Sequence, residues 1–323
     1  MTKNDLRIVF MGTPEFAVET LKALVENQYH VVAVVTQPDK PVGRHGSVLQ
    51  PSAVKQYALS QGLPVLQPEK MKDPAFVEQL RAYQANLQVV VAFRMLPEVV
   101  WAMPEYGTFN VHAALLPQYR GAAPINWAVI NGETRTGVTT FFLDHDIDTG
   151  RIIMQLPFDI PDDADVEYVY DGLMRLGAEI CLKTLEAIIA ADGHPASMAQ
   201  EDVANSPLLS APKIFKETCE IDWAKTAKQV YDFVRGLSPY PGAWTTLVAP
   251  DGKETVLKIF KTRKTRKETH AEKGCVAVEG KSLLVATHDE WLAIEELQLA
   301  GKKRMAARDF LNGMKDIESY TIK

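Results

Sequence analysis

Three side chains between positions 110 and 148 could carry out chemistry together. Asn110 and His112 stand two positions apart at the end of an apolar stretch, and residues with this spacing project from the same face of a strand. Asp148 lies in a polar loop that follows the next predicted strand. An amide and a protonated imidazole can stabilise a developing oxyanion, and an imidazole beside a carboxylate can move protons near neutral pH. These residue types therefore favour acyl-group chemistry.

Other kinds of site fit the sequence less well. No Ser or Cys occupies a nucleophile elbow such as G-x-S-x-G, which argues against a covalent acyl-enzyme. Asp144, Asp146 and Asp148 alternate as at the start of a calcium loop, but the glycine comes at the seventh position and the twelfth is Gln155. We therefore expect no metal, and a solvated acidic turn remains the simpler interpretation. The fingerprint G-x-G-x-x-G is absent after the first predicted strand, so NAD binding is poorly supported.

The elements that must position these residues alternate between strands and helices. The predicted strands are short and apolar throughout, as in a parallel sheet that is covered on both faces. This pattern predicts an α/β fold with an open, mostly parallel sheet and with ligands at the carboxyl ends of its strands. Thr13 is expected to cap the first helix with Pro14 in its first turn, and residues 36–51 are expected to form a long loop. The predicted strands cover residues 6–11, 31–35, 63–66, 87–93, 109–112 and 138–143, and further helices cover residues 52–61, 74–82 and 165–191.

The second half of the chain has a different pattern. Residues 194–212 are rich in Pro, Ser and Asn and are typical of a linker. A helix is predicted over residues 221–236, and several short strands with turn signals follow it, as in a small β-barrel. We therefore predict a catalytic domain over residues 1–191, a linker over residues 192–208 and a C-terminal barrel over residues 209–323.

The net charge of −6 is distributed unevenly along the chain. Residues 1–207 carry a net charge of −10, whereas residues 208–323 carry +4. The positive charge is concentrated in residues 258–267, in Lys302–Arg308 and at Lys213 and Lys216 beside the linker. This asymmetry suggests that the second domain meets an anionic partner, although runs of charge are more often solvated faces.

The remaining composition favours a cytoplasmic protein. No apolar run approaches the roughly 18 residues of a membrane span. The charged start leads directly into a strand, which is unlike a secretory or transit peptide. Cys181, Cys219 and Cys275 are isolated, so neither a disulfide scaffold nor a zinc site is expected. We also expect a monomer.

Four stretches of the sequence resemble the folate-dependent formyltransferase superfamily. In order, they are Val9–Ala17, Thr36–Arg44, Asn110–Ile125 and Ile147–Gly150. The third stretch is specific to the superfamily, and the second is similar to its tRNA-directed members, as are Pro241–Trp244 and Leu297–Gly313. The resemblance implies a Rossmann-like formyltransferase domain followed by an OB-like barrel. It also implies 10-formyltetrahydrofolate as the donor and the α-amino group of methionyl initiator tRNA as the acceptor.

The resemblance further implies roles for particular residues. Asn110, His112 and Asp148 would be catalytic: the amine attacks the formyl carbon directly, Asn110 and His112 hold the oxyanion, and Asp148 is hydrogen-bonded to His112. Where the family commonly has Tyr-Gly, this chain has Phe93-Arg94, which changes the rim of the folate pocket. That pocket would be formed by Phe93, Arg94, Met95, Leu96, Pro97, Leu115, Leu116, Pro117, Asp144 and Asp146.

Ten basic residues are expected to contact tRNA. Arg44 is predicted to enter the end of the acceptor stem, because Gly43 and Gly46 let the backbone around it adapt. The family often continues with glycine and lysines after Arg44, whereas residues 45–50 of this chain contain no lysine, which weakens the expected contact. The residues of the second domain would hold phosphates and position the RNA without reading its sequence. The ten residues are Lys40, Arg44, Lys213, Lys261, Arg263, Lys264, Arg266, Lys267, Lys303 and Arg304.

Three other functions remain open from the sequence. A formyltransferase could act on a sugar nucleotide or a glycinamide ribonucleotide, although such an enzyme has no evident use for a basic barrel. An inactive α/β scaffold could bind RNA without catalysis, but all three catalytic residue types are present. A nicotinamide dehydrogenase would need the missing glycine fingerprint. A comparison of acceptors and a measurement of folate binding separate these alternatives.

Overall fold

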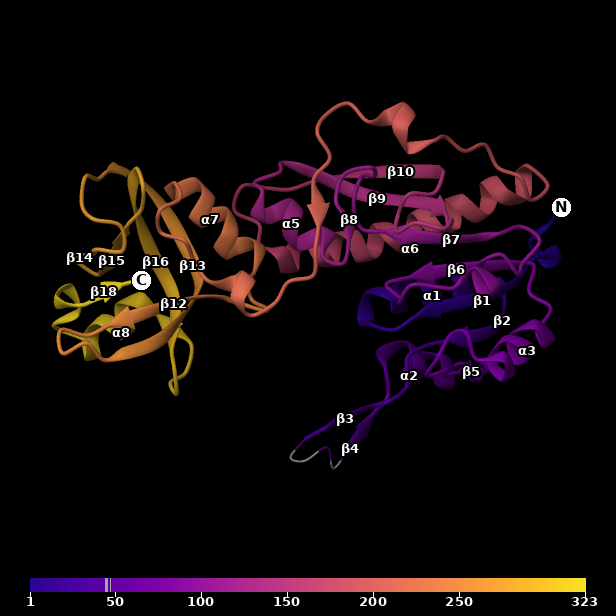
Figure 1. The fold of residues 1–323 in the computed structure, drawn as a ribbon, viewed down its shortest axis with the longest axis horizontal. Coiled ribbons are helices and arrows are strands. Elements are labelled where there is room, and N and C mark those ends of the chain that lie inside the picture. Colours follow the sequence, from indigo (N-terminus) through magenta and orange to yellow (C-terminus); the bar gives the residue numbers. More distant parts are fainter. Residues whose placement is uncertain (44–45, 47) are drawn as a thin grey trace. The chain divides into compact units, whose positions relative to one another are not determined.

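The computed structural model describes residues 1–43, 46 and 48–323, and the chain divides into two compact units (Figure 1). The first unit comprises Met1–Gly121, Arg135–Asp159 and Tyr170–Ser210. The second unit comprises Ala122–Thr134, Ile160–Val169 and Ala211–Lys323. The units therefore interleave along the sequence, whereas the predicted domains are continuous. Residues 192–208, for which the sequence predicts a linker, belong to the first unit.

The first unit is built around a sheet with the strand order β10-β9-β7-β6-β1-β2-β5. The strands from β7 to β5 pair in parallel, and β9 and β10 add an antiparallel edge. The predicted α/β fold with a mostly parallel sheet is confirmed. The strands are β1 (Arg7–Gly12), β2 (His30–Val35), β5 (Val65–Leu66), β6 (Leu87–Val91), β7 (Thr108–His112), β9 (Arg135–Phe142) and β10 (Ile152–Asp159).

Helices cover both faces of this sheet, as its apolar strands require. On one face, α3 and α4 pack against buried side chains of β1, β2 and β6. On the other face, α6 lies against β9, where the hydroxyls of Thr184 and Thr140 are hydrogen-bonded at 2.8 Å. The helices are α1 (Glu15–Glu26), α2 (Ala53–Ser60), α3 (Pro74–Ala82), α4 (Glu98–Trp101) and α6 (Val166–Ala190), which continues into the first unit from the second.

The start of α1 differs from the prediction. Pro14 is the N-cap residue and its backbone is extended, with ψ of 172°, so helical geometry begins only at Glu15. Thr13 therefore does not cap the helix. Its Oγ1 instead accepts the N–H of Gln37 at 3.4 Å, which connects the end of β1 to the segment after β2.

Residues 36–51 are not the plain loop that their composition predicts. Lys40–Val42 (β3) and Val48–Gln50 (β4) pair in an antiparallel hairpin that extends away from the sheet of the first unit (Figure 1). The sequence pattern conceals these strands because Pro41 interrupts one of them, as proline does on an edge strand. Arg44, His45 and Ser47 lie outside the described residues. The predicted contact of Arg44 with the acceptor stem therefore lies outside them as well.

The second unit contains a curled antiparallel sheet in the order β14-β15-β16-β13-β12-β18, with β17 paired to β16. Its two edges meet, because Cys275 forms a bridge with Thr321 and the N–H of Ile322 donates to the Gly274 carbonyl at 3.0 Å. The predicted small barrel is confirmed. Its strands are β12 (Ala243–Val248), β13 (Glu254–Glu268), β14 (Val276–Glu279), β15 (Ser282–Ala286), β16 (Glu290–Leu299), β17 (Met305–Ala306) and β18 (Thr321–Ile322).

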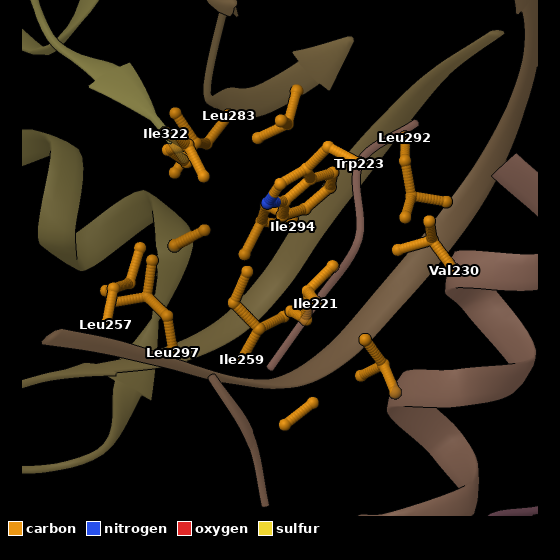
Figure 2. Packing of buried hydrophobic residues seen from close by; sticks show 14 of the residues in the cluster. Ile221, Trp223, Val230, Leu257, Ile259, Leu283, Leu292, Ile294, Leu297 and Ile322 are labelled. Carbon is orange, nitrogen blue, oxygen red and sulfur yellow. The ribbon is translucent and has the colours of Figure 1, made fainter. Parts of the chain in front are cut away.

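The interior of the barrel is apolar. Figure 2 shows Trp223 among Ile294, Leu283 and Val230, with side chains of β13 and β16 around them. Three α-helices lie entirely within this unit, α5 (Pro124–Ile130), α7 (Ala227–Gly236) and α8 (Ala307–Gly313), and α6 begins in it. The short strands β8 (Arg120–Gly121) and β11 (Ser210–Ala211) stand where the chain passes from one unit to the other.

Two elements of the second unit differ from the prediction. The helix predicted from Ile221 begins only at Ala227, because Thr226 caps it by accepting the N–H of Gln229 at 3.2 Å. Ile221 and Trp223 enter the barrel core instead. β13 is longer than the short strands that the sequence predicts. It continues through the basic residues 258–267 to Glu268 and accommodates shifts of register such as that between Lys264 and Lys267.

Candidate active site

Asn110 and His112 lie on β7 near the centre of the sheet, and strand alternation places both side chains on the same face. His112 is only 6% exposed. Oδ1 of Asn110 is buried and has no hydrogen-bond partner among the described residues. Because buried amide oxygens are nearly always hydrogen-bonded, this atom indicates a position where a donor group of a ligand would bind.

The hydrogen bond of His112 decides which of its nitrogens can exchange a proton. Nε2 lies 2.9 Å from the carbonyl oxygen of Tyr119. A carbonyl can only accept, so Nε2 carries a hydrogen and Nδ1 is the nitrogen that remains for proton exchange. Nδ1 faces Oδ2 of Asp148 at 3.9 Å, which is longer than the hydrogen bond that the family resemblance implies. The two groups are nevertheless close enough to act on one ligand atom.

Asp148 is held by its own loop and by the backbone rather than by His112. Its Oδ2 accepts the N–H of Gly121 at 2.9 Å, and its side chain is 12% exposed. Its φ of +56° is uncommon for a residue with a Cβ atom. Two residues later, a Cβ atom on Gly150 would lie 1.6 Å from the carbonyl oxygen of Phe142, so only glycine allows the loop to pack this closely on β9.

Gln200 also supports this loop, although sequence reasoning did not identify it. Its Nε2 donates to the carbonyls of Asp148 and Gly150, both at 2.8 Å. Its Oε1 accepts two hydrogen bonds from the Arg120 guanidinium, at 3.0 and 2.7 Å. Gln200 begins a short 3-10 helix, Gln200–Val203, within the predicted linker segment. A lone polar residue in such a segment carries no sequence signal of burial.

Thr139 of β9 fixes the course of the chain just after His112. Its hydroxyl donates to the Ala114 carbonyl at 2.7 Å and accepts the N–H of Leu116 at 3.1 Å. Gln155 donates to the Leu116 carbonyl at 2.8 Å. These bonds hold the segment that includes Leu115, Leu116 and Pro117, which are predicted to line the folate pocket.

The predicted folate-pocket residues lie in different environments. Leu96 and Leu116 are buried in apolar clusters, whereas Met95 is 68% exposed. Oδ1 of Asp144 accepts the hydroxyl hydrogen of Thr149 at 2.8 Å and so organises its own loop. The assignment of these residues to folate stays a prediction, together with that of Phe93, Pro97, Leu115, Pro117 and Asp146.

Arg94 has a structural role that the sequence does not predict. Its guanidinium donates to the carbonyls of Pro68 and Glu69, the latter at 2.9 Å. Burial lowers the pKa of the Arg94 guanidinium. The segment that it holds lines a cavity of about 860 Å³ together with Phe76 and Gln79. None of the predicted catalytic residues lines this cavity, so we do not place folate there.

Five of the ten basic residues predicted to contact tRNA have acidic partners. Lys264 is 14% exposed and lies 2.7 Å from Asp162, and Arg263 lies 3.2 Å from Glu295. Lys261, Lys267 and Arg304 likewise face Glu295, Glu279 and Glu296. In the described part of the chain, no ion pair is formed by Lys40, Lys213, Arg266 or Lys303. These four residues are exposed and are therefore accessible to an external anion.

The described residues contain neither a metal-binding cluster nor a membrane-spanning helix. No three His, Cys, Asp or Glu side chains there are grouped so that they could hold a metal ion. No helix formed by these residues combines the length and the apolar character that crossing a membrane requires.

Comparison with known families gives two matches. Residues 6–185 match the model described as formyl transferase, and residues 213–315 match the model of the formyl transferase C-terminal domain.

Among curated relatives, the methionyl-tRNA formyltransferase of Parabacteroides distasonis is 61% identical over 325 residues, and that of Bacteroides thetaiotaomicron is 57% identical over 324 residues. Both alignments cover all of this chain and all of the relative.

Solved structures share the fold at low identity. HypX from Aquifex aeolicus, in complex with tetrahydrofolic acid, has a TM-score of 0.61 at 19% identity, over 96% of this chain and 48% of its own. The N-formyltransferase from Helicobacter canadensis has a TM-score of 0.61 at 18% identity, over 93% of this chain and 100% of its own. At these identities the likeness concerns the fold alone.

Proposed function

This chain belongs to the formyl transferase family, and we propose that it transfers a formyl group from 10-formyltetrahydrofolate to the α-amino group of methionyl initiator tRNA. The activity named for its full-length relatives supports this acceptor, and the family supports a folate donor. The positive charge of residues 208–323 also favours a polyanionic acceptor over a small amine.

The observation that carries the chemistry is that Asn110 and His112 share one face of β7 and that Asp148 lies beside His112. Their side chains supply a buried amide oxygen with no hydrogen-bond partner among the described residues, an imidazole nitrogen free to exchange a proton, and a carboxylate 3.9 Å from that nitrogen. An acyl transfer to an amine can use all three: an acceptor orients the N–H of the attacking amine, a protonated imidazole stabilises the charge that develops on the carbonyl oxygen, and a carboxylate takes the proton that the amine loses.

In the proposed reaction, a bond forms between the amine nitrogen and the formyl carbon, and the bond from that carbon to N10 of the folate breaks. Asn110 and the protonated Nδ1 of His112 stabilise the negative charge that develops on the formyl oxygen. Asp148 accepts the proton that the amine loses, and N10 takes up a proton as it departs. Oδ1 of Asn110 is placed to accept an N–H of the attacking amine.

The direct test is to incubate the purified chain with methionyl initiator tRNA, with and without 10-formyltetrahydrofolate, and to measure formylmethionine after deacylation. We expect formylmethionine only when the folate is present. Methionyl elongator tRNA and an amino-sugar nucleotide serve as alternative acceptors. Formylation of the amino sugar but not of the tRNA would leave the donor chemistry standing and overturn the proposed acceptor.

We further infer that the second unit holds the RNA through phosphates, while the hairpin β3–β4 supplies a second contact through Lys40. The support for this is the set of exposed cations without acidic partners in the described residues, which in the second unit are Lys213, Arg266 and Lys303. Lys261, Arg263, Lys264, Lys267 and Arg304 would first have to give up an ion pair.

We also infer that the enzyme is cytoplasmic and monomeric. The location is supported by its substrate, because charged initiator tRNA is used by cytoplasmic translation. Measuring the mass of the protein in solution tests the oligomeric state.

A further inference from the structure

Gln200 is densely hydrogen-bonded beside the candidate active site. It is 1% exposed, both hydrogens of its amide nitrogen are donated, and its amide oxygen accepts two hydrogen bonds. All four of its bonds reach residues at least 50 positions before it in the sequence: Arg120, Asp148 and Gly150. The residue therefore connects two parts of the site that do not adjoin in the sequence.

Those two parts are the segment Tyr119–Gly121 and the loop that carries Asp148. The Tyr119 carbonyl accepts from His112, and the Gly121 N–H donates to the Asp148 carboxylate. Arg120, between them, donates to Gln200, which itself binds the carbonyls of Asp148 and Gly150. One closed network thus fixes the orientation of the imidazole and the position of the carboxylate.

On the basis of the proposed function, which this inference deepens, we propose that Gln200 is a positioning residue that acts through Asp148 and holds the carboxylate in its place beside His112. The loop needs such a restraint because Asp148 has a φ of +56°, a conformation that costs free energy for a residue with a Cβ atom. Gln200 binds the backbone on both sides of Thr149, so it restrains the strained residue directly.

A purely structural role would be to fasten the segment of residues 192–208 to the first unit. Gln118 provides a matched comparison for that role. Its amide donates to Ser206 at 2.9 Å and to Pro207 at 3.1 Å, and it accepts the N–H of Leu209 at 2.8 Å. Gln118 therefore fastens the same segment, but none of these bonds involves Asp148.

The experiment compares Gln200→Ala, Gln200→Glu and Gln118→Ala, with kcat and KM measured for both substrates. We expect Gln200→Ala to lower kcat by up to about 100-fold, the loss typical of misplacing a catalytic group by about 1 Å, with little change in either KM. Gln118→Ala should retain the wild-type kcat. Thermal melting of each variant confirms that the measured protein is folded.

Gln200→Glu separates the hydrogen bonds that Gln200 accepts from those that it donates. A carboxylate still accepts from Arg120, but it presents an acceptor to the carbonyls of Asp148 and Gly150, which are also acceptors. We expect this variant to be as defective in kcat as Gln200→Ala. A wild-type kcat for Gln200→Glu would overturn the proposal, because Arg120 would then be the only partner that matters.

A double-mutant cycle with Asp148→Asn tests whether Gln200 acts through Asp148. If Gln200 acts through Asp148, Gln200→Ala should lower kcat at most about threefold in the Asp148→Asn background, because the carboxylate that Gln200 positions is already gone. The same loss in both backgrounds would overturn the proposal.

A readout without substrate separates this inference from the proposed function. The NMR signals of the His112 imidazole should move in Gln200→Ala and stay in place in Gln118→Ala, because only the former releases Asp148. Unmoved signals in Gln200→Ala would contradict the positioning role. An unreactive wild-type enzyme whose imidazole signals do respond to Gln200→Ala would contradict the proposed substrates instead.

Discussion

The hydrogen bond from Nε2 of His112 to the Tyr119 carbonyl assigns the tautomer of this residue and leaves Nδ1 beside Asp148. From this geometry we expect His112→Ala to lower kcat by about 10²–10³-fold, because the imidazole that stabilises the developing oxyanion is lost. The measurement is formylation of methionyl initiator tRNA at saturating folate. His194→Ala, at an exposed histidine of the first unit, is the control and should keep the wild-type rate. A folded His112→Ala variant with normal turnover would remove His112 from the mechanism.

Asp148→Asn tests the carboxylate while preserving its shape. The amide oxygen of the substituted side chain can still accept the N–H of Gly121, so we expect the loop to keep its conformation. The variant can no longer accept the amine proton, and kcat should fall by about 10²–10⁴-fold with little change in folate binding. A comparable loss of folate affinity would show that Asp148 binds the donor rather than moving protons. Asp159→Asn, at an exposed residue paired with Arg135, is the matched control.

Residue types and their order predict that Asn110, His112 and Asp148 act together, and the structure brings His112 and Asp148 to 3.9 Å from each other, while their catalytic roles stay a prediction. Their restraints were not predictable. Gly121 contributes only a backbone N–H, and Gln200 comes back to the site from a segment with no periodic pattern. Such contributions depend on how distant parts of the chain meet, which local sequence does not encode.

At the scale of elements, the hairpin β3–β4 needs support at its base, because an isolated two-stranded hairpin is marginal in water. Thr36 and Ser52 share a hydrogen bond of 2.7 Å across its two ends. Lys55 binds the Asp39 carboxylate at 2.8 and 3.0 Å, and Gln67 binds it at 2.8 Å. These bonds fix the direction in which the hairpin leaves the sheet, and with it the position of Lys40.

We therefore expect Asp39→Asn to raise the KM for tRNA by about two- to fivefold, as for the loss of a partly exposed ion pair, with kcat unchanged. Steady-state kinetics over a range of tRNA concentrations measures this. Glu78→Gln, which removes the partner of Arg81 on α3, should leave both constants unchanged. A fall in kcat without a change in KM would place Asp39 in a different role.

The support that Asp39 gives to the base of the hairpin should depend on pH. Hydrogen bonds from Lys55 and then from Gln67 hold the pKa of the Asp39 carboxyl below its ordinary value. The ionised Asp39 carboxylate therefore contributes fully to the stability of the hairpin base above its ordinary pKa of about 3.9. This contribution is lost as the pH falls through the lower pKa of the folded state. Hydrogen exchange of residues 48–55 should be slower in the wild type than in Asp39→Asn at neutral pH. The two proteins should converge on acidification, and a constant difference at all pH values would contradict this account.

Elements with strong local signals were easier to predict than elements without them. Continuous apolar strands and a helix such as α3, with Asp73 as its cap and Pro74 in its first turn, carry strong local signals. The hairpin and the start of α7 do not. The spacing of Ile221 and Trp223 is compatible with a helix, but both side chains are buried in the barrel core, and this tertiary packing outweighs the local pattern.

At the scale of the whole molecule, charge separates the two halves of the sequence. Residues 1–207 carry −10 and would repel RNA, so the attraction must come from cations elsewhere. We expect combined replacement of Lys213, Arg266 and Lys303 by alanine to raise the KM for tRNA. The same variant should reduce the dependence of log affinity on log salt by about 0.7–0.9 for each phosphate that the protein no longer neutralises.

The control for this variant changes the net charge by the same amount in the first unit. Lys22, Arg81 and Lys183 each lie near a glutamate of their own helix, and their replacement by alanine should leave the salt dependence unchanged. If the two triple variants behaved alike, overall charge rather than a defined surface would attract the RNA. If neither had an effect, Lys261, Arg263, Lys267 and Arg304 would be the residues to examine next.

The network around Gln200 also affects the order of events during folding. It joins residues 112, 119–121, 148–150 and 200, so its hydrogen bonds close loops of up to 80 residues, and long-range contacts form late in folding. Helices consist of local contacts and can form before these loops close. During refolding from denaturant, formyl transfer should therefore return after the circular dichroism of the helices has recovered, which makes catalytic activity a late marker of folding in this enzyme.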